Sequence, residues 1–281
     1  MIKLLVTDLD GTFLAPDHRP GRYITEENKE ALDRFRQQGG IFVTCSGRHH
    51  EFSYLLMEEL GFHFDTIGIN GNTIIHKDCL VEHNHPRRQH VIKVVEELTK
   101  EFYRDKIEVI GIDLAGNPIF GDPHSWASER FRKNPNKVVN ETPLLQYIKN
   151  RRNPDVTSIH VNVKDPDTLH DWIKKLRIMF DQHFDIYASG PINIEFMKPG
   201  INKGYGVRSI MKIYGLQEHE VAVAGDNQND ISMFFAAKHS YCMATATPQV
   251  QKYATKVVNS VAEALEDIIR QNELEMISKE I

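Results

Sequence analysis

The N-terminal part of the chain contains the stretch Leu4-Leu5-Val6-Thr7-Asp8-Leu9-Asp10-Gly11-Thr12. Its apolar, β-prone half predicts a buried strand, and Gly11 permits a tight turn directly after the two carboxylates. Because side chains alternate along a strand, Asp8 and Asp10 are expected to point the same way, at the edge where open α/β sheets bind ligands. Two like charges this close repel each other, which favours a cation such as Mg²⁺ between them. An ordinary strand that ends in an acidic turn is the alternative for this stretch alone.

The composition is that of an ordinary globular protein. The 281 residues are 41% hydrophobic and 26% charged, which suits one large or two smaller domains. The formal net charge of −5 argues against a nucleic-acid partner but is compatible with a local basic pocket for a phosphorylated metabolite. No apolar run has the length of a membrane span and no secretory signal is recognisable, so no membrane partner is expected and the predicted location is the cytoplasm.

The scattered cysteines lack a Cys-x-x-Cys pattern and are expected to be buried or partly buried free thiols: Cys45, Cys79 and Cys242.

Strand and helix patterns alternate in two blocks, and a stretch of different texture separates them. In the first block, strands run into Ser46-Gly47-Arg48 and into Asn70-Gly71, and in the last block a helix opens at Lys203 and a buried strand runs into Gly225-Asp226-Asn227-Gln228-Asn229-Asp230. Between the blocks, alternating strands and amphipathic helices predict a separate α+β unit. The sequence therefore predicts an α/β protein, with a Rossmann-like doubly wound parallel-sheet core and an inserted α+β domain. The expected ranges are 1–82 and 191–281 for the core and 83–190 for the insertion.

The predicted strand ends bring groups with complementary chemistry to one edge of the sheet. The carboxylates of Asp8, Asp10 and Asp226 suit one Mg²⁺ ion. The helix start after Ser46-Gly47-Arg48 offers N–H groups and a hydroxyl to an anion, and Lys203 offers a point charge for phosphate. Cations that neutralise phosphate oxygens allow a carboxylate to attack phosphorus, while a second carboxylate moves the protons. The set favours phosphoryl transfer, although a surface lysine, a helix-capping serine and an arginine in a surface ion pair are the alternatives for single residues.

The chain resembles the haloacid dehalogenase superfamily in four motifs that occur in the family's order: Asp8-Leu9-Asp10-Gly11-Thr12, Ser46-Gly47-Arg48, Lys203, and Gly225-Asp226-x-x-Asn229-Asp230. The resemblance covers essentially the whole chain. Within the superfamily, the chain resembles the Cof-type phosphatases, in which a large α/β cap lies between the second and third motifs. It implies a Mg²⁺-dependent phosphatase that acts on a small phosphorylated metabolite, with sugar phosphates as the leading class. The inserted domain would be the cap that selects the substrate.

The resemblance also implies roles for the motif residues. Asp8 would be the nucleophile that forms an aspartyl-phosphate, and Asp10 the general acid/base. Mg²⁺ would be held by Asp8, the main-chain carbonyl of Asp10 and Asp226, with Asp230 in support. Lys203 would be catalytic, and the residues implied in phosphate or substrate binding are Gly11, Thr12, Ser46, Gly47, Arg48, Asn70, Lys203 and Asn229. One departure is Thr245, which stands where the family has Asn.

Two other functions are compatible with the same motifs. A phosphomutase or phosphotransferase would pass the phosphoryl group from the aspartyl-phosphate to a sugar hydroxyl instead of water. A catalytically weak phosphometabolite-binding protein would share the fold, but the intact set of Asp8, Asp10, Lys203 and Asp226 argues against it.

Overall fold

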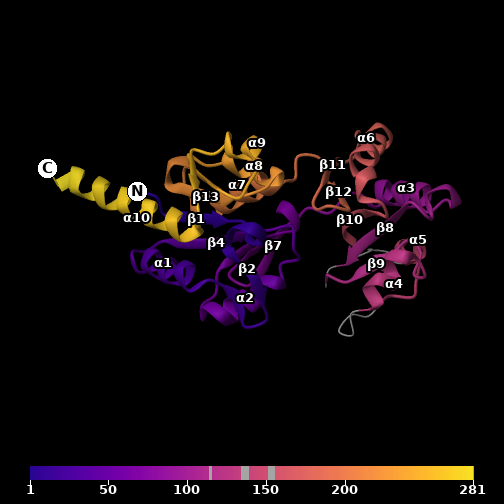
Figure 1. Ribbon diagram of the computed structural model, residues 1–281, viewed down its shortest axis with the longest axis horizontal. Coiled ribbons are helices and arrows are strands. Elements are labelled where there is room, and N and C mark those ends of the chain that lie inside the picture. The colour runs from indigo at the N-terminus through magenta and orange to yellow at the C-terminus, as the bar shows by residue number, and fades with distance from the viewer. Residues whose placement is uncertain (114–115, 134–138, 151–155, 281) are drawn as a thin grey trace. The chain divides into compact units, whose positions relative to one another are not determined.

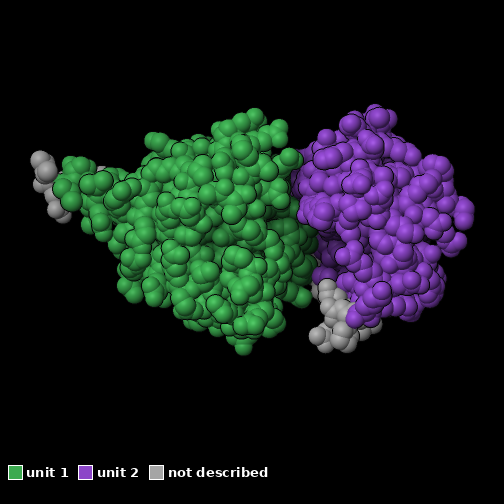
Figure 2. Space-filling view, viewed as in Figure 1, with its two compact units in different colours: residues 1–83, 202–281 green, residues 84–201 purple. Residues whose placement is uncertain are grey.

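The computed structural model describes residues 1–113, 116–133, 139–150 and 156–280. The chain divides into two compact units, shown in green and purple in Figure 2: unit 1 is Met1–His83 with Asn202–Ile281, and unit 2 is Asn84–Ile201. The predicted fold class, a mainly parallel α/β core with an inserted α+β domain, is confirmed. The predicted second junction, after residue 190, differs from this division because β12 (Asn193–Met197) pairs with strands of unit 2.

Unit 1 is built on an eight-stranded sheet in which β1 (Leu4–Thr7) is central. The strand order is β15-β14-β13-β1-β4-β5-β6-β7, and the strands from β15 to β5 are parallel. The strands on the two sides of β1 come from opposite ends of the chain, so the edge after β1 and β13 is a topological switch point. The other strands are β4 (Ile41–Cys45), β5 (Asp65–Gly68), β6 (Thr73–His76), β7 (Cys79–His83), β13 (Val221–Gly225), β14 (His239–Met243) and β15 (Lys256–Val258).

Helices cover both faces of this sheet (Figure 1). On one face lie α1 (Glu26–Gln37), α2 (Phe52–Leu60) and α10 (Val261–Glu280), and on the other lie α7 (Lys203–Tyr214), α8 (Ile231–Phe234) and α9 (Pro248–Gln251). Alternation along β1 places Leu5 in the apolar cluster of the first face and Val6 in that of the second. The turn after β1 leads into an antiparallel hairpin of β2 (Leu14–Arg19) and β3 (Arg22–Ile24).

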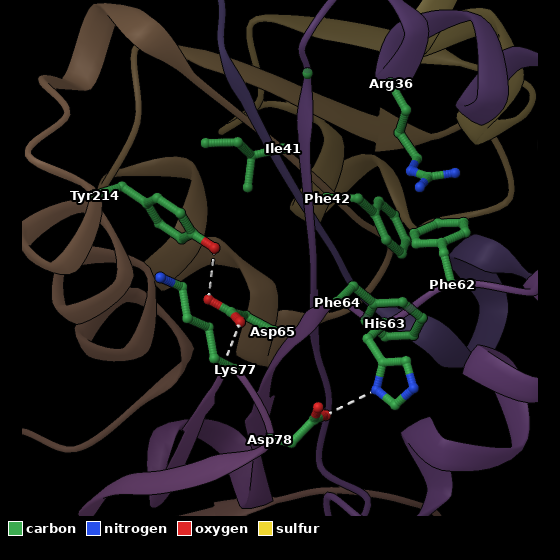
Figure 3. A pocket seen from close by; sticks show the side chains of 11 residues that line it. Arg36, Ile41, Phe42, Phe62, His63, Phe64, Asp65, Lys77, Asp78 and Tyr214 are labelled. Carbon is green, nitrogen blue, oxygen red and sulfur yellow. Dashed lines mark hydrogen bonds and ion pairs between the residues drawn. The ribbon is translucent and has the colours of Figure 1, made fainter.

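The β6–β7 hairpin turns at Lys77 and Asp78, whose φ angles are 50° and 61°. The carboxylate of Asp65, at the start of β5, accepts hydrogen bonds from the Lys77 N–H at 3.0 Å and from the Tyr214 hydroxyl at 2.8 Å (Figure 3). These residues border a pocket of about 350 Å³ at the amino ends of β4 and β5, the edge of the sheet opposite the switch point. Asp65 thereby connects the β6–β7 hairpin to α7.

Unit 2 contains a five-stranded antiparallel sheet in the order β11-β12-β10-β8-β9. Its other strands are β8 (Ile107–Asp113), β9 (Pro118–Phe120), β10 (Val156–Val163) and β11 (Asp185–Ala188). The helices α3 (Arg88–Leu98), α5 (Leu144–Asn150) and α6 (Leu169–Phe180) pack on one face, and α4 (Trp126–Arg132) packs on the other. This is the helix-covered antiparallel sheet that the alternating pattern predicts.

No helix in the described ranges combines the length and the apolar character needed to cross a membrane. All three cysteines are free thiols, and Cys45 and Cys242 are buried. Cys79 is exposed, which corrects the expectation that all three are at least partly buried; it lies on β7, the last strand of the sheet.

Glu108 makes the stability of unit 2 depend on pH. This β8 side chain is 5% exposed, and burial raises its pKa from 4.5 to about 7, although the Asp122 N–H donates to it at 3.0 Å. A carboxyl whose pKa is higher in the folded state contributes stability below pH 4.5 and loses it as the pH rises through about 7. We expect Glu108→Gln, which stays neutral, to gain up to about 3 kcal/mol of unfolding free energy relative to the wild type between pH 5 and pH 8.

Urea denaturation followed by tryptophan fluorescence measures this difference, because both tryptophans, Trp126 and Trp172, lie in unit 2. Glu129→Gln, at an exposed position of α4, is the control and should follow the wild type at every pH. A constant difference between Glu108→Gln and the wild type across this pH range would contradict the expectation.

Candidate active site

Three carboxylates meet at the switch point of the unit 1 sheet. Asp8 follows β1 and Asp226 follows β13, and the Asp8 N–H donates to the carbonyl of Ala224 at 2.8 Å, which fixes the two strand ends side by side. Asp230 lies in the turn after β13. Carboxylate oxygens of Asp8, Asp226 and Asp230 all lie within 4.8 Å of one another. This group of three is a candidate metal site, and the Asp10 side chain is not part of it.

The ammonium group of Lys203 lies between two of these carboxylates. Its Nζ is 2.6 Å from Asp8 Oδ1 and 2.5 Å from Asp230 Oδ1, and the residue is 1% exposed. Burial by itself lowers the pKa of Lys203, but the Asp230 and Asp8 carboxylates outweigh it and raise the pKa. Burial, reinforced by the charge of Asp230, raises the pKa values of Asp8 and Asp226. One ammonium therefore faces three carboxylates, and the excess of negative charge favours an additional cation.

The first turn of α7 positions Lys203 through close backbone packing. The Asn202 side chain caps the helix by accepting a hydrogen bond from the Tyr205 N–H at 2.9 Å. A Cβ added at Gly204 would lie 2.1 Å from the carbonyl oxygen of Ser232, and the Gly204 N–H donates to Ser232 Oγ at 3.0 Å. The backbones of α7 and α8 thus touch beside Lys203, which holds its side chain against the turn that carries Asp230.

Gly11, Thr12 and Asp230 fix the position of Asp226. The Thr12 hydroxyl donates to Asp226 Oδ1 at 2.9 Å, and Asp230 Oδ2 accepts hydrogen bonds from the N–H groups of Asp226 and Asn227, each at 2.9 Å. Gly11 has a φ angle of 79°, and an added Cβ there would lie 2.6 Å from Asp226 Oδ2, so that only glycine fits this turn. Gly11 and Thr12 therefore position a carboxylate, and their implied part in phosphate binding stays a prediction.

The Asp10 side chain pairs with Arg48. The side chain of Asp10 is 50% exposed, and its two oxygens accept hydrogen bonds from Arg48 Nε at 2.6 Å and Nη2 at 2.5 Å. These bonds, against the effect of partial burial, raise the pKa of Arg48. The guanidinium also lies 4.0 Å over the ring of Phe52, and its Nη2 is 3.4 Å from His18 Nε2. Of the two alternatives for Arg48, the structure shows an ion pair; its implied contact with substrate stays a prediction.

A second polar group lies at the ends of β4 and β5. The Asn70 N–H donates to the Ser46 carbonyl at 2.9 Å, and the Asn229 amide donates to Asn70 Oδ1 at 3.1 Å. Ser46 Oγ accepts a hydrogen bond from the Arg48 N–H at 3.1 Å. The expectation of a helix start directly after Arg48, with Ser46 as its cap, is wrong, because α2 begins only at Phe52 and Glu51 precedes it as the N-cap residue. A Cβ at Gly47 would lie 3.2 Å from Asn70 Nδ2. Ser46, Gly47, Asn70 and Asn229 are thus brought together, and their roles toward substrate stay predictions.

The residues that the sequence pattern missed support those that it found. Ser232 is a serine on a short helix, and His18 and Phe52 contact Arg48 from β2 and α2. None of them belongs to a motif, and each meets its partner only through the fold. Thr245, at the position that departs from the family pattern, is exposed after β14.

The chain matches the model of one protein family, described as haloacid dehalogenase-like hydrolase, over residues 5–265. It is 26% identical over 250 residues to the 5-amino-6-(5-phospho-D-ribitylamino)uracil phosphatase YbjI of Escherichia coli, covering 87% of this chain and 86% of that protein. It is 26% identical over 278 residues to YwtE of Bacillus subtilis, which has the same enzyme name, covering 92% and 93%. The structure of a haloacid dehalogenase-like hydrolase from Bacteroides thetaiotaomicron superposes with a TM-score of 0.77 at 24% identity, covering 95% of this chain and 100% of that one.

The chain belongs to the haloacid dehalogenase-like hydrolases. The predicted family is confirmed, and so is the predicted enzyme class, a phosphoric monoester hydrolase.

Gly204 offers a test of how Lys203 is held. We expect Gly204→Ala to lower the free energy of unfolding by about 1–3 kcal/mol or more, because its Cβ would press on the backbone of α8. Far-UV circular dichroism in urea measures the change. Arg208→Ala, at an exposed position of the same helix, is the matched control and should stay within about 0.5 kcal/mol of the wild type. Equal free energies of unfolding for the two variants would show that Gly204 does not pack closely against the backbone of α8.

Proposed function

We propose that this protein hydrolyses small phosphorylated metabolites with Mg²⁺ as cofactor, through an aspartyl-phosphate formed on Asp8. The observation that carries the proposal is the buried contact of Asp8 with Lys203, 2.6 Å, at the switch point of the sheet. A carboxylate beside an ammonium and two further carboxylates is suited to attack a phosphorus whose oxygens are neutralised by cations. The same residues carry the family's motifs.

The proposed reaction has two steps, and in each step one bond to phosphorus forms while another breaks. An oxygen of Asp8 attacks the phosphorus, and the bond from phosphorus to the leaving oxygen breaks while Asp10 gives that oxygen a proton. Asp10 then takes a proton from water, whose oxygen attacks the phosphorus and releases inorganic phosphate and Asp8. Arg48, with hydrogen bonds to both Asp10 oxygens, would hold this carboxylate in position between the steps.

The donor set fits a hard divalent cation. Asp8, Asp226 and Asp230 offer carboxylate oxygens, which Mg²⁺ prefers, and Lys203 alone does not neutralise them. We propose that these residues hold Mg²⁺, with the main-chain carbonyl of Asp10. Bound there, the ion would neutralise developing charge on the phosphate oxygens. Ser46, Lys203 and Asn229 would contact the phosphate or orient the site.

Two classes of substrate follow from different observations. Sugar phosphates are the class implied by the family resemblance. A phosphorylated ribitylaminouracil is the substrate in the names of the YbjI and YwtE relatives. Both are small phosphate monoesters, and we propose them as the first substrates to compare.

The nucleophile is tested with Asp8→Asn. We expect phosphate release from a panel of sugar phosphates, nucleotides and the phosphorylated ribitylaminouracil to fall at least about a thousandfold, because the amide does not attack phosphorus. Asp17→Asn, which replaces an exposed carboxylate on β2, is the control and should retain activity. Undiminished release by Asp8→Asn would rule out the proposed mechanism.

The same panel separates the alternatives. Phosphate that appears without isomerisation of the sugar favours hydrolysis, whereas isomerised sugar phosphate without free phosphate favours a mutase. Equally negligible rates on every substrate favour a binding protein.

The metal is tested by thermal unfolding with and without Mg²⁺. For the wild type we expect Mg²⁺ to raise the melting temperature, by about 2–4 °C for each kcal/mol of binding energy. Because burial and Asp230 raise the pKa of Asp226, its charge destabilises the metal-free fold at neutral pH. In the presence of a chelator, Asp226→Asn should therefore melt at or above the wild-type temperature. Added Mg²⁺ should leave the melting temperature of this variant unchanged. If Mg²⁺ raised the melting temperature of both proteins equally, the ion would bind at a site that does not include Asp226.

A further inference from the structure

One residue holds the side chain of Asp10. In the described part of the chain its hydrogen bonds come from Arg48 alone, at 2.6 and 2.5 Å, and they reach both carboxylate oxygens. Both partners are partly exposed, Asp10 by 50% and Arg48 by 34%. An exposed ion pair between long side chains does not by itself fix one geometry, because water competes and rotamer freedom is lost. Arg48 therefore holds Asp10 in one place only if its own guanidinium is held.

The ring of Phe52 supports that guanidinium from one side. Phe52 is the first residue of α2, and the guanidinium carbon of Arg48 lies 4.0 Å from the centroid of its ring. A cation is attracted to the face of an aromatic ring, and a planar guanidinium that stacks on a ring keeps its edge available for hydrogen bonds. Phe52 thus restricts Arg48 without competing for the N–H groups that bind Asp10.

His18 contacts the same guanidinium at its edge. His18 Nε2 lies 3.4 Å from Arg48 Nη2, and its Nδ1 lies 3.0 Å from the carbonyl oxygen of Ala15. Because a carbonyl only accepts, Nδ1 is the N–H of the neutral imidazole and Nε2 is the acceptor that faces Arg48. Nη2 carries two N–H groups, so it can donate to Asp10 and to His18 at once. His18 is therefore a second support of the guanidinium.

The two supports belong to one packed frame. The Glu59 carboxylate, near the end of α2, accepts hydrogen bonds from the N–H groups of Tyr23 at 2.6 Å and Ile24 at 3.1 Å, which ties the β2–β3 hairpin to this helix. The Tyr23 ring also meets the Phe52 ring edge to face, with the centroids 5.4 Å apart. The hairpin that carries His18 and the helix that carries Phe52 are thus fixed to each other.

We propose that Phe52 and His18 are positioning residues for proton transfer by Asp10, and that they act through Arg48. The inference rests on the proposed function, in which Asp10 protonates the leaving oxygen as its bond to phosphorus breaks. When Asp10 gives up this proton it becomes a carboxylate, which the guanidinium binds with both N–H groups, so a fixed Arg48 favours the transfer. A loose guanidinium would lose this advantage, because its ordering would then oppose the reaction.

Two phosphate esters that differ in their need for a proton test this role. The sugar oxygen of ribose 5-phosphate needs a proton to leave, whereas 4-nitrophenolate leaves as a stable anion. We expect Phe52→Leu, which removes the ring face, to lower kcat/KM about tenfold for ribose 5-phosphate and less than about twofold for 4-nitrophenyl phosphate. Phe52→Tyr, which restores the ring, should recover the wild-type values. Equal losses on the two esters, or no loss on either, would overturn the proposal.

A double-mutant cycle tests whether Phe52 acts through Arg48. In the Arg48→Ala background, Phe52→Leu should not lower kcat/KM for ribose 5-phosphate any further, and a second tenfold loss would contradict the proposal. Tyr54→Leu removes an exposed ring from the same helix and is the matched control, which should leave both esters unchanged. His18→Gln, which keeps an acceptor, should be more active on ribose 5-phosphate than His18→Leu.

Proton NMR measures the contact without a substrate. The Hε signal of Arg48 is assigned by its loss in Arg48→Lys. We expect Phe52→Leu to shift this signal and to speed its exchange with water, and Phe52→Tyr to preserve the slow exchange. An unchanged signal in Phe52→Leu would show that the ring does not hold the guanidinium. If the wild type hydrolyses neither ester, the proposed function fails, while this signal still decides whether Phe52 holds Arg48.

Discussion

The arrangement of unit 1 depends on two buried ion pairs that share one ammonium group, those of Lys203 with Asp8 and with Asp230. Charges removed from water must be paired closely, because an uncompensated buried charge costs several kcal/mol. That requirement explains the tight packing around these pairs. Gly204 lets α7 touch α8, so that the ammonium reaches both carboxylates, and Asp230 uses its other oxygen to hold the turn after β13. The pairing of β1 with β13 then places Asp8 and Asp226 side by side.

The two acids of the first motif have different surroundings. Asp8 is buried among other carboxylates, where a cation is needed to stabilise its charge, whereas Asp10 is half exposed and bound by the guanidinium of Arg48. Neighbouring positions in one turn thus receive opposite environments. This difference in surroundings is compatible with the separate roles proposed for Asp8 as nucleophile and for Asp10 as proton carrier.

Unit 2 uses its sheet in a different way. Its apolar face is covered by three helices and supplies the core of the unit. The other face packs against α4, and it combines aromatic side chains with amides and a histidine. The alternation of β10 separates the two sets of side chains on one strand.

The sequence by itself determined the parallel core, the inserted α+β unit and the motif residues, because strand ends, glycines and acids leave local patterns. It also predicted that Asp8, Asp226 and Asp230 come together, whereas the Asp10 side chain lies apart from them and Ser46 caps no helix. Only the tertiary structure decided that Arg48 binds Asp10, that Ser232 positions Gly204, that β12 belongs to unit 2 and that Trp126 keeps an unpaired N–H. Each of these depends on side chains or strands that are distant in the chain, and the folding of the backbone brings them together.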